Sequence, residues 1–164
     1  MEAILKEPSA SRAAELVRGC KVAALGTFHH GGPSVSMVPY AIIEDPLAFV
    51  VLVSALSAHT KEMLDDPNVA LMIMEPETGT KPPHALARVC MQGRAEPLSQ
   101  DHSRFGAARA VYTARFPDMV GLFELGDFTL FAIAPATVRV IAGFAQAASI
   151  TPASFARSMR HTGQ

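Results

Sequence analysis

Apolar residues in the first half of the chain fall into short runs that are separated by strong turn signals. The runs cover Val22–Phe28, Ser34–Ile43 and Leu47–Ser54, and the turns are His29-His30-Gly31-Gly32-Pro33 and Glu44-Asp45-Pro46. The runs are rich in β-branched residues, which is typical of strands. Because the spacers are too short for a crossover helix, we expect these strands to be joined as antiparallel hairpins.

The second half continues this pattern. The runs that we expect to be strands are Val69–Met74, Arg88–Glu96, Thr129–Ala134 and Thr137–Ala142. A glycine inside a strand pattern often marks a bulge, so a β-bulge is predicted at Gly93. Proline interrupts strand pairing, so the last two runs are predicted to form a hairpin around Pro135.

Helical segments flank these strands. They are predicted at Ser11–Arg18, Ala58–Asp66, Gln100–Arg115 and Asp118–Leu125, with one more short helix in the tail after Thr151. No repeat, low-complexity stretch or linker divides the chain. We therefore expect one mainly β domain over residues 1–164, with flanking helices, a core at about 20–150 and a C-terminal tail at 151–164.

Two of the runs, Leu47–Val53 and Val69–Met74, are apolar at every position. An antiparallel strand with one face in water alternates between apolar and polar residues, so both faces of these two strands should be covered. Either a second copy of the chain packs on the sheet, or helices of the same chain cover it. The sequence shows too few long amphipathic helices to cover both strands, and this scarcity favours a homodimer.

Composition limits the class of protein. The chain has 164 residues, of which 49% are hydrophobic, which suits one domain with a sizeable core. Lys and Arg number 14 and Asp and Glu 15, and this net charge of -1 lacks the attraction on which nucleic-acid binders rely. Charged residues make up 18%, below the roughly 25% of an average domain, so part of the surface is expected to be covered.

Signals for membranes, secretion and disulfides are missing. The longest apolar run, Leu47–Val53, is shorter than the ~20 residues of a membrane helix. The N-terminus lacks the basic and apolar segments of a secretory signal. Cys20 and Cys90 form no CxxC motif and are expected to be free thiols. We expect a cytoplasmic protein that binds neither nucleic acid nor membrane.

The clearest binding signal lies where a buried strand ends at Ser54 and a helix begins near Ala58. The first turn of a helix exposes unpaired N–H groups and the positive end of its dipole, which suit an anion. Hydroxyls of Ser57 and Thr60 and the ammonium of Lys61 lie in the same segment. Such donors match the oxygens of a phosphate monoester.

A structural explanation of the same segment stays open. Ser57 would cap the helix, and Lys61 would pair with Asp65 one helical turn later. Caps followed by lysine are common in helices, so the spacing alone does not decide between the two explanations.

Histidines form no metal-binding pattern. His29 and His30 are adjacent, and on an extended segment they would point to opposite faces. His84, His102 and His161 lack zinc-site spacing, so no metal site is predicted. A single histidine is enough only as an axial ligand of haem. The GxSxG, HExxH, GxGxxG and Walker motifs are absent, so any chemistry is expected to come from a bound cofactor, and whether the protein is an enzyme stays open.

Four stretches occur in a characteristic order. They are Ala24-Leu25-Gly26-Thr27 with Val38-Pro39-Tyr40-Ala41, Leu52-Val53-Ser54 with His59-Thr60-Lys61, Arg88-Val89-Cys90-Met91-Gln92-Gly93-Arg94-Ala95, and Gly126-Asp127-Phe128 followed by Gly143-Phe144. Through their order and spacing, the region from Leu25 to Ile150 resembles the FMN-binding split-barrel proteins related to pyridoxamine 5'-phosphate oxidase. The resemblance is strongest to the branch that includes haem-utilisation proteins.

This resemblance implies a split β-barrel, a homodimer and a flavin groove between the subunits. By the same resemblance, Thr60 and Lys61 would bind the phosphate of FMN, with Ser54 and His59 beside them. Ser36, Met37 and Val38 would follow the edge of the isoalloxazine ring, Tyr40 would lie nearby, and Arg88 and Gln92 would reach the cofactor from the barrel wall.

Departures from the family pattern shape the functional expectation. The segment Ser34–Tyr40 has no basic residue and the chain has no Trp, which argues against oxidation of pyridoxamine phosphate. Glu62 stands where this branch usually has Asn and adds a negative charge near the proposed phosphate site. We expect an FMN-binding protein, a flavin-dependent oxidoreductase of unknown substrate. The alternatives are a haem-binding or haem-degrading protein with His161 as ligand, and a cofactor-free dimeric interaction module.

Overall fold

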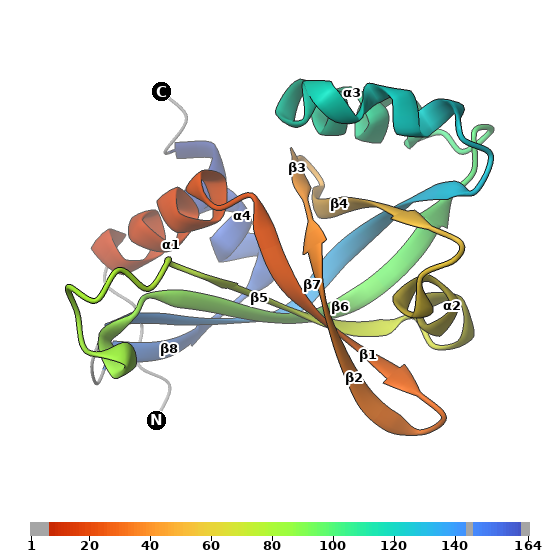
Figure 1. Cartoon of the computed structure of the whole chain (residues 1–164). Helices are drawn as coiled ribbons and strands as arrows, with labels where there is room; N and C mark the ends of the chain where they lie inside the picture. Colours follow the sequence, from red (N-terminus) through yellow and green to blue (C-terminus); the bar gives the residue numbers. More distant parts are fainter. Residues whose placement is uncertain (1–6, 144–145, 162–164) are drawn as a thin grey trace.

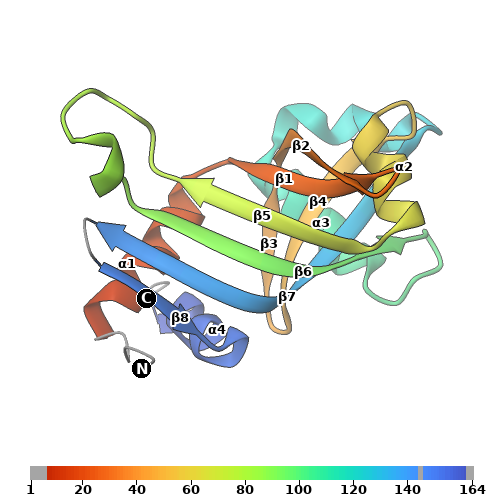
Figure 2. The ribbon, with the colours of Figure 1, turned by 90° about the horizontal axis from the view of Figure 1, so that it is seen from below.

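All eight strands belong to one antiparallel sheet that curves strongly without closing (Figures 1 and 2). The computed structural model describes residues 7–143 and 146–161. The strands are β1 (Val22–His29), β2 (Gly32–Pro39), β3 (Ala41–Glu44), β4 (Leu47–Ser54), β5 (Asn68–Met74), β6 (Arg88–Leu98), β7 (Phe128–Gly143) and β8 (Gln146–Ile150). Their order is β2-β1-β5-β6-β7-β4-β3, with β8 paired to β7. The mainly β prediction is confirmed.

The helices lie close to their predicted positions. They are α1 (Glu7–Gly19), α2 (Ala58–Asp65), α3 (Phe105–Arg115) and α4 (Pro152–His161), with two 3-10 segments, η1 (Pro83–Ala85) and η2 (Pro117–Glu124). The predicted helix over Gln100–Arg115 begins only at Phe105, because residues before it form turns. Among the described residues, none of the helices has the length and apolar character needed to cross a bilayer.

The predicted strand Ser34–Ile43 is two strands in the structure. Up to Pro39 the chain pairs with β1, and the amide of Tyr40 donates to the carbonyl of Lys21 at 3.1 Å. From Ala41 onward the chain pairs with β4, at the other end of the sheet. The apolar pattern runs on through this switch, and Pro39, the last residue of β2, is a local sign of it that the sequence prediction did not use.

The predicted hairpin around Pro135 is wrong. β7 is one continuous strand of 16 residues, and its hairpin partner is the unpredicted β8. Pro135 is accommodated because it faces Gly93, where the register of β6 shifts and the ladder is already interrupted. The predicted irregularity therefore lies beside Gly93, but the extra residue is Ala136 of β7 and not a residue of β6. A Cβ atom at Gly93 would lie 2.3 Å from the carbonyl oxygen of Ala134, so the two backbones meet where there is no side chain.

Strand β4 is buried on both faces. Phe49, Val51 and Val53 belong to one core, and Val50 and Leu52 belong to a second core beneath α3 and η2. Helices of the same chain therefore cover β4, as in the second of the two explanations that the sequence left open.

Strand β5 alternates between buried and exposed residues. Leu71 and Ile73 are buried, whereas Ala70, Met72 and Met74 are exposed. The prediction that both faces are covered is therefore not met within a single chain, and in Figure 2 no helix lies over the face of β5 that carries these exposed residues.

Tyr40 and Arg115 fasten the end of α1 to the rest of the molecule. The Tyr40 hydroxyl donates to the carbonyl of Val17 at 2.6 Å, and burial raises the pKa of this phenol. The Arg115 guanidinium lies over the Tyr40 ring at 5.4 Å and donates to the carbonyls of Arg18, at 2.9 Å, and Cys20. Charge-assisted donors here satisfy carbonyls that a helix end leaves unpaired.

Candidate functional site

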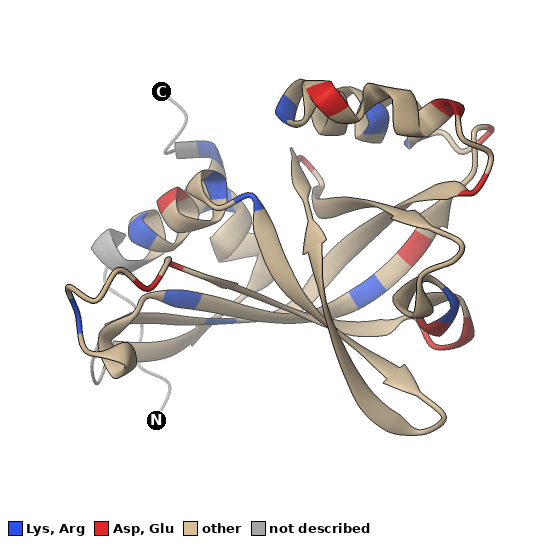
Figure 3. Cartoon of the chain, viewed as in Figure 1, with Lys and Arg blue, Asp and Glu red and all other residues tan. Residues whose placement is uncertain are grey.

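The open face of the sheet carries a groove of about 760 Å³. We call it the open-face groove; residues of β1, β2, β5, β6, β7 and β8 and the start of α4 line it. Strands β1, β2 and β5 contain no Lys, Arg, Asp or Glu, and their ribbons are uncoloured by charge in Figure 3. A weakly charged, largely apolar hollow of this size suits a planar organic ligand.

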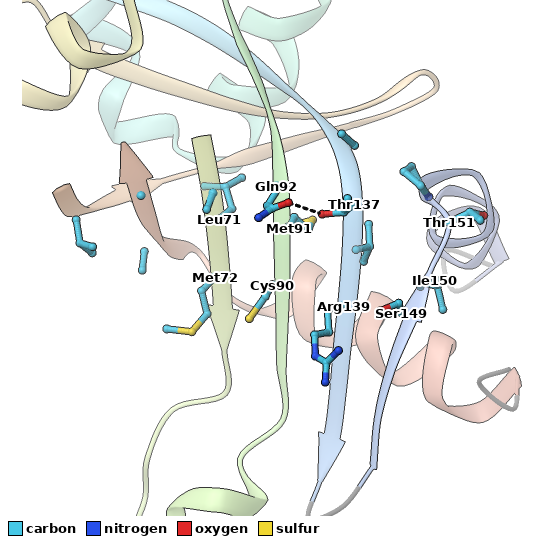
Figure 4. A pocket seen from close by; sticks show the side chains of 17 residues that line it. Leu71, Met72, Cys90, Met91, Gln92, Thr137, Arg139, Ser149, Ile150 and Thr151 are labelled. Carbon is cyan, nitrogen blue, oxygen red and sulfur yellow. Dashed lines mark hydrogen bonds between the residues drawn. The ribbon is translucent and has the colours of Figure 1, made fainter. Parts of the chain in front are cut away.

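The strand register places the groove residues in two rows across the sheet (Figure 4). One row is Ala24, Met72, Cys90, Arg139 and Ser149, and the other is Gly26, Ala70, Gln92 and Thr137. In both rows the β1 and β5 positions are small or apolar, while the polar side chains lie on β6, β7 and β8. At the polar end, the Thr137 hydroxyl donates to Oε1 of Gln92 at 3.4 Å.

The beginning of α2 uses most of its hydroxyls internally. Ser54 Oγ donates to Oδ2 of Asp127 at 2.8 Å and accepts from the amide of Leu56. Thr60 Oγ1 donates to the carbonyl of Ser54 at 2.6 Å, and Thr60 is buried. These bonds tie the end of β4 to the start of α2 and to β7, so both hydroxyls serve the fold.

Lys61 remains available at this helix start. Its side chain is exposed, and neither an ion pair to Asp65 nor a cap bond from Ser57 exists in the described part of the chain. The structural explanation of the segment is therefore not supported by these contacts. The exposed ammonium at the positive end of the helix dipole keeps the capacity to bind an anion.

Glu62 is directed away from solvent and toward β1. It is 4% exposed, it accepts from the Thr27 hydroxyl at 2.5 Å, and its Oε1 lies 3.3 Å from Nδ1 of His29. Both carboxylate oxygens thus have partners in the interface between α2 and β1. The negative charge of Glu62, which the sequence analysis placed near the proposed phosphate site, is therefore directed at Thr27 and His29.

His29 and His30 do not point to opposite faces, which corrects the sequence interpretation. They form the β1–β2 turn, with φ of 48° at His30 and 79° at Gly31, and their ring centroids lie 4.2 Å apart. Together with Lys61 they line a second cavity of about 670 Å³. Within residues 7–143 and 146–161, no three His, Cys, Asp or Glu side chains are arranged to hold a metal ion.

His59 lies at the first turn of α2 and is half-buried. Burial lowers its pKa, and the Glu62 carboxylate only partly opposes that shift. A base whose pKa is lower in the folded state stabilises the fold above its unfolded value of 6.5 and loses that contribution as the pH falls.

We therefore expect the acid-induced loss of stability below about pH 6.5 to be smaller in His59→Gln than in the unmodified protein. Urea unfolding at a series of pH values measures this difference. His84→Gln, which removes an imidazole from an exposed position outside α2, is the control variant. Identical profiles for all three proteins would contradict a lowered His59 pKa.

The remaining predicted site residues are dispersed. Met37 is 63% exposed on the open face, but Val38 and Tyr40 are in the core. Ser36 Oγ is buried without a hydrogen-bond partner among the described residues. Arg88 donates to the carbonyl of Leu86 at 3.1 Å. Helix α4 ends at His161, whose side chain lies outside the described residues.

Within one chain, Gln92 therefore lies in the open-face groove and Lys61 in the second cavity. Sequence reasoning missed Arg139, Thr137 and Met72, which line the groove. Alternation along β7 would have placed Arg139 on the open face, but the prediction of a hairpin around Pro135 interrupted that pattern.

Known proteins similar to this chain carry haem in their names. Heme oxygenase HutZ of Vibrio cholerae is 29% identical over 122 residues, which cover 74% of this chain and 68% of HutZ. The chloroplastic non-canonical heme oxygenase HOZ of Arabidopsis thaliana is 32% identical over 136 residues, but this chain spans only 40% of HOZ. A heme binding protein from Mycobacterium smegmatis superposes with a TM-score of 0.80 at 25% identity, over 94% of this chain and 62% of that one.

These likenesses confirm the split-barrel fold and the branch that the sequence resembles. The family described as pyridoxamine 5'-phosphate oxidase matches residues 10–142, which is most of the chain. Together with the unclosed antiparallel sheet, this match shows that the chain belongs to the pyridoxamine 5'-phosphate oxidase family.

Proposed function

We propose that this chain is a haem-binding member of its family, with haem in the open-face groove and a second copy of the chain over it. The groove is the observation that carries the proposal. The groove has a volume of about 760 Å³, which suits a ligand of the size of haem, and its residues are mostly small or apolar. The names of HutZ, HOZ and the mycobacterial protein support the same ligand.

The residues present fit a flat macrocycle. Gly26 and Ala70 are neighbours on β1 and β5, and even a Cβ atom at Gly26 would be only 3.4 Å from that of Ala70, so the floor is low and closely packed. Bound haem would supply redox chemistry, while the chain would orient the ligand and exclude water. His161 at the end of α4 is the candidate axial ligand from the sequence.

A second copy explains the open face. Met72 and Met74 are 38% and 41% exposed on β5, and Val35 and Met37 of β2 are exposed on the same face, with β1 between the two strands. Apolar side chains that gather on one sheet face mark an interaction surface. A two-fold dimer covers identical patches on both copies at once, and it encloses the groove between the subunits.

Titration of the purified protein with haemin tests the proposal. We expect a saturable change of the Soret band, with the protein eluting as a dimer in gel filtration. His161→Ala should alter the band if this histidine is the ligand. A protein without a saturable Soret change would refute haem binding, and a stable dimer that binds neither haem nor FMN would be an interaction module.

FMN is the second candidate, because Lys61 is free at the start of α2. Lys61→Ala is expected to weaken FMN binding by about 1–3 kcal/mol, the range for a lost charged hydrogen bond. Quenching of flavin fluorescence measures the affinity, and Lys81→Ala, on a distant loop, is the control. Equal affinities for FMN and riboflavin would show that no phosphate is bound.

A further inference from the structure

We propose that Arg139 is the anchor for an anionic group of the groove's ligand, and specifically for a propionate carboxylate of haem. The inference rests on the proposed function and adds to it the residue that would orient the ligand. Nothing in the family resemblance pointed to this arginine, which lies in the predicted strand Thr137–Ala142 and had no role assigned to it.

Charge in the groove is confined to one position. Among the described residues that line the groove, Arg139 is the one charged side chain, and no Asp or Glu is among them. The arginine is exposed and forms no ion pair or hydrogen bond within the described part of the chain. An arginine without a carboxylate partner in a largely apolar hollow is a site for a ligand's anion.

Polar groups near Arg139 offer further hydrogen-bond donors for the ligand's anionic group. Its neighbours across the sheet are Cys90 and Ser149, and Thr137 lies two residues earlier on β7 (Figure 4). Because Gln92 Oε1 accepts from Thr137, the amide nitrogen of Gln92 keeps its donors. Donors of the guanidinium, the Ser149 hydroxyl and the Gln92 amide therefore lie at the same end of the groove.

When a second copy of the chain covers the open face, the Arg139 guanidinium needs an anionic partner. Burying a guanidinium away from water costs free energy unless an anion pairs with it. If the two grooves face each other, the second copy brings its own arginine, and no Asp or Glu lines the groove. The ligand is then the source of the negative charge.

The rest of the groove defines the ligand class. Toward β1 and β5 the floor is Ala24, Gly26, Ala70 and Met72, which offers apolar contact and no charge. The ligand is therefore an amphipathic molecule with a broad apolar body and an acidic edge. Haem has this form, with two carboxylates on one edge of a flat macrocycle.

Haemin and its dimethyl ester, which has no free carboxylate, test the inference by absorbance titration in the same mild detergent. The protein is compared with Arg139→Gln and with the control Arg94→Gln. Arg94 is exposed on β6, lies outside the groove and contacts Asn68 at 3.3 Å. Circular dichroism and gel filtration establish that each variant is folded.

We expect Arg139→Gln to weaken haemin binding at least about tenfold, as loss of charged hydrogen bonds requires, and to leave the affinity for the ester unchanged. Arg94→Gln should bind both ligands like the unmodified protein. Equal haemin affinities with and without Arg139, or an equal loss for haemin and ester, would overturn the anchor while leaving haem binding intact. Failure of the unmodified protein to bind either ligand would instead refute the proposed function.

Discussion

Substitution of Gly93 by alanine is expected to lower the free energy of unfolding by about 3 kcal/mol. The added Cβ would lie 2.3 Å from the carbonyl oxygen of Ala134 and 3.3 Å from Cα of Pro135, so two strands must separate to admit it. Neither contact is the end of a flexible side chain, so a change of rotamer cannot relieve the overlap. Urea denaturation measures the loss.

Gly106→Ala is the matched control for this substitution. Gly106 lies in helix α3, and a Cβ there would have nothing within 4 Å. Alanine is the better helix former, so this variant should gain about 0.5–1 kcal/mol. A loss below about 1 kcal/mol in Gly93→Ala would mean that the bulge tolerates a side chain and that its glycine is not required by the strand contact.

Substitution of Ala70 by aspartate is expected to break the proposed dimer and raise its dissociation constant at least about a hundredfold. Ala70 is exposed on β5 in the middle of the open face. A dimer that covers this face would have to bury an aspartate from each copy without a partner, which costs about 3 kcal/mol or more. Sedimentation equilibrium measures the dissociation constant.

Ala107→Asp serves as the control, because Ala107 is exposed on α3, far from the open face. It adds the same charge to the chain and should leave the association unchanged. An Ala70→Asp protein that remains dimeric would move the interface elsewhere on the molecule. The exposed methionines of β5 would then need another explanation.

Local signals in the sequence were sufficient for much of the fold. The turn at His30 and Gly31, the turn before Leu47 and the stop at Pro67 are short-range features of the chain, and the elements around them are found close to their predicted bounds. Pro135 is the instructive failure. Proline within a strand is confined to an edge, the first residue or a bulge, and only the pairing with Gly93 reveals the register shift that accommodates Pro135.

The candidate site was predictable only in part. Lys61 was found because helix starts have a sequence pattern, and the structure leaves its ammonium free. The groove was not found because its rows join strands far apart in the sequence, such as Met72 on β5 and Arg139 on β7. Tyr40 matches the family pattern, but its place in the core depends on the contact with Val17 of α1.

Because β4 is buried on both faces, it couples the unfolding of the two cores. Because Phe49 and Val51 belong to one core and Val50 and Leu52 to the other, neither core can melt without exposing half of the same strand. The two cores are therefore expected to unfold as one cooperative unit. Hydrogen exchange at the β4 amides should then proceed only through global unfolding, at the slowest rates in the protein, whereas the edge strand β2 should exchange through local fluctuations.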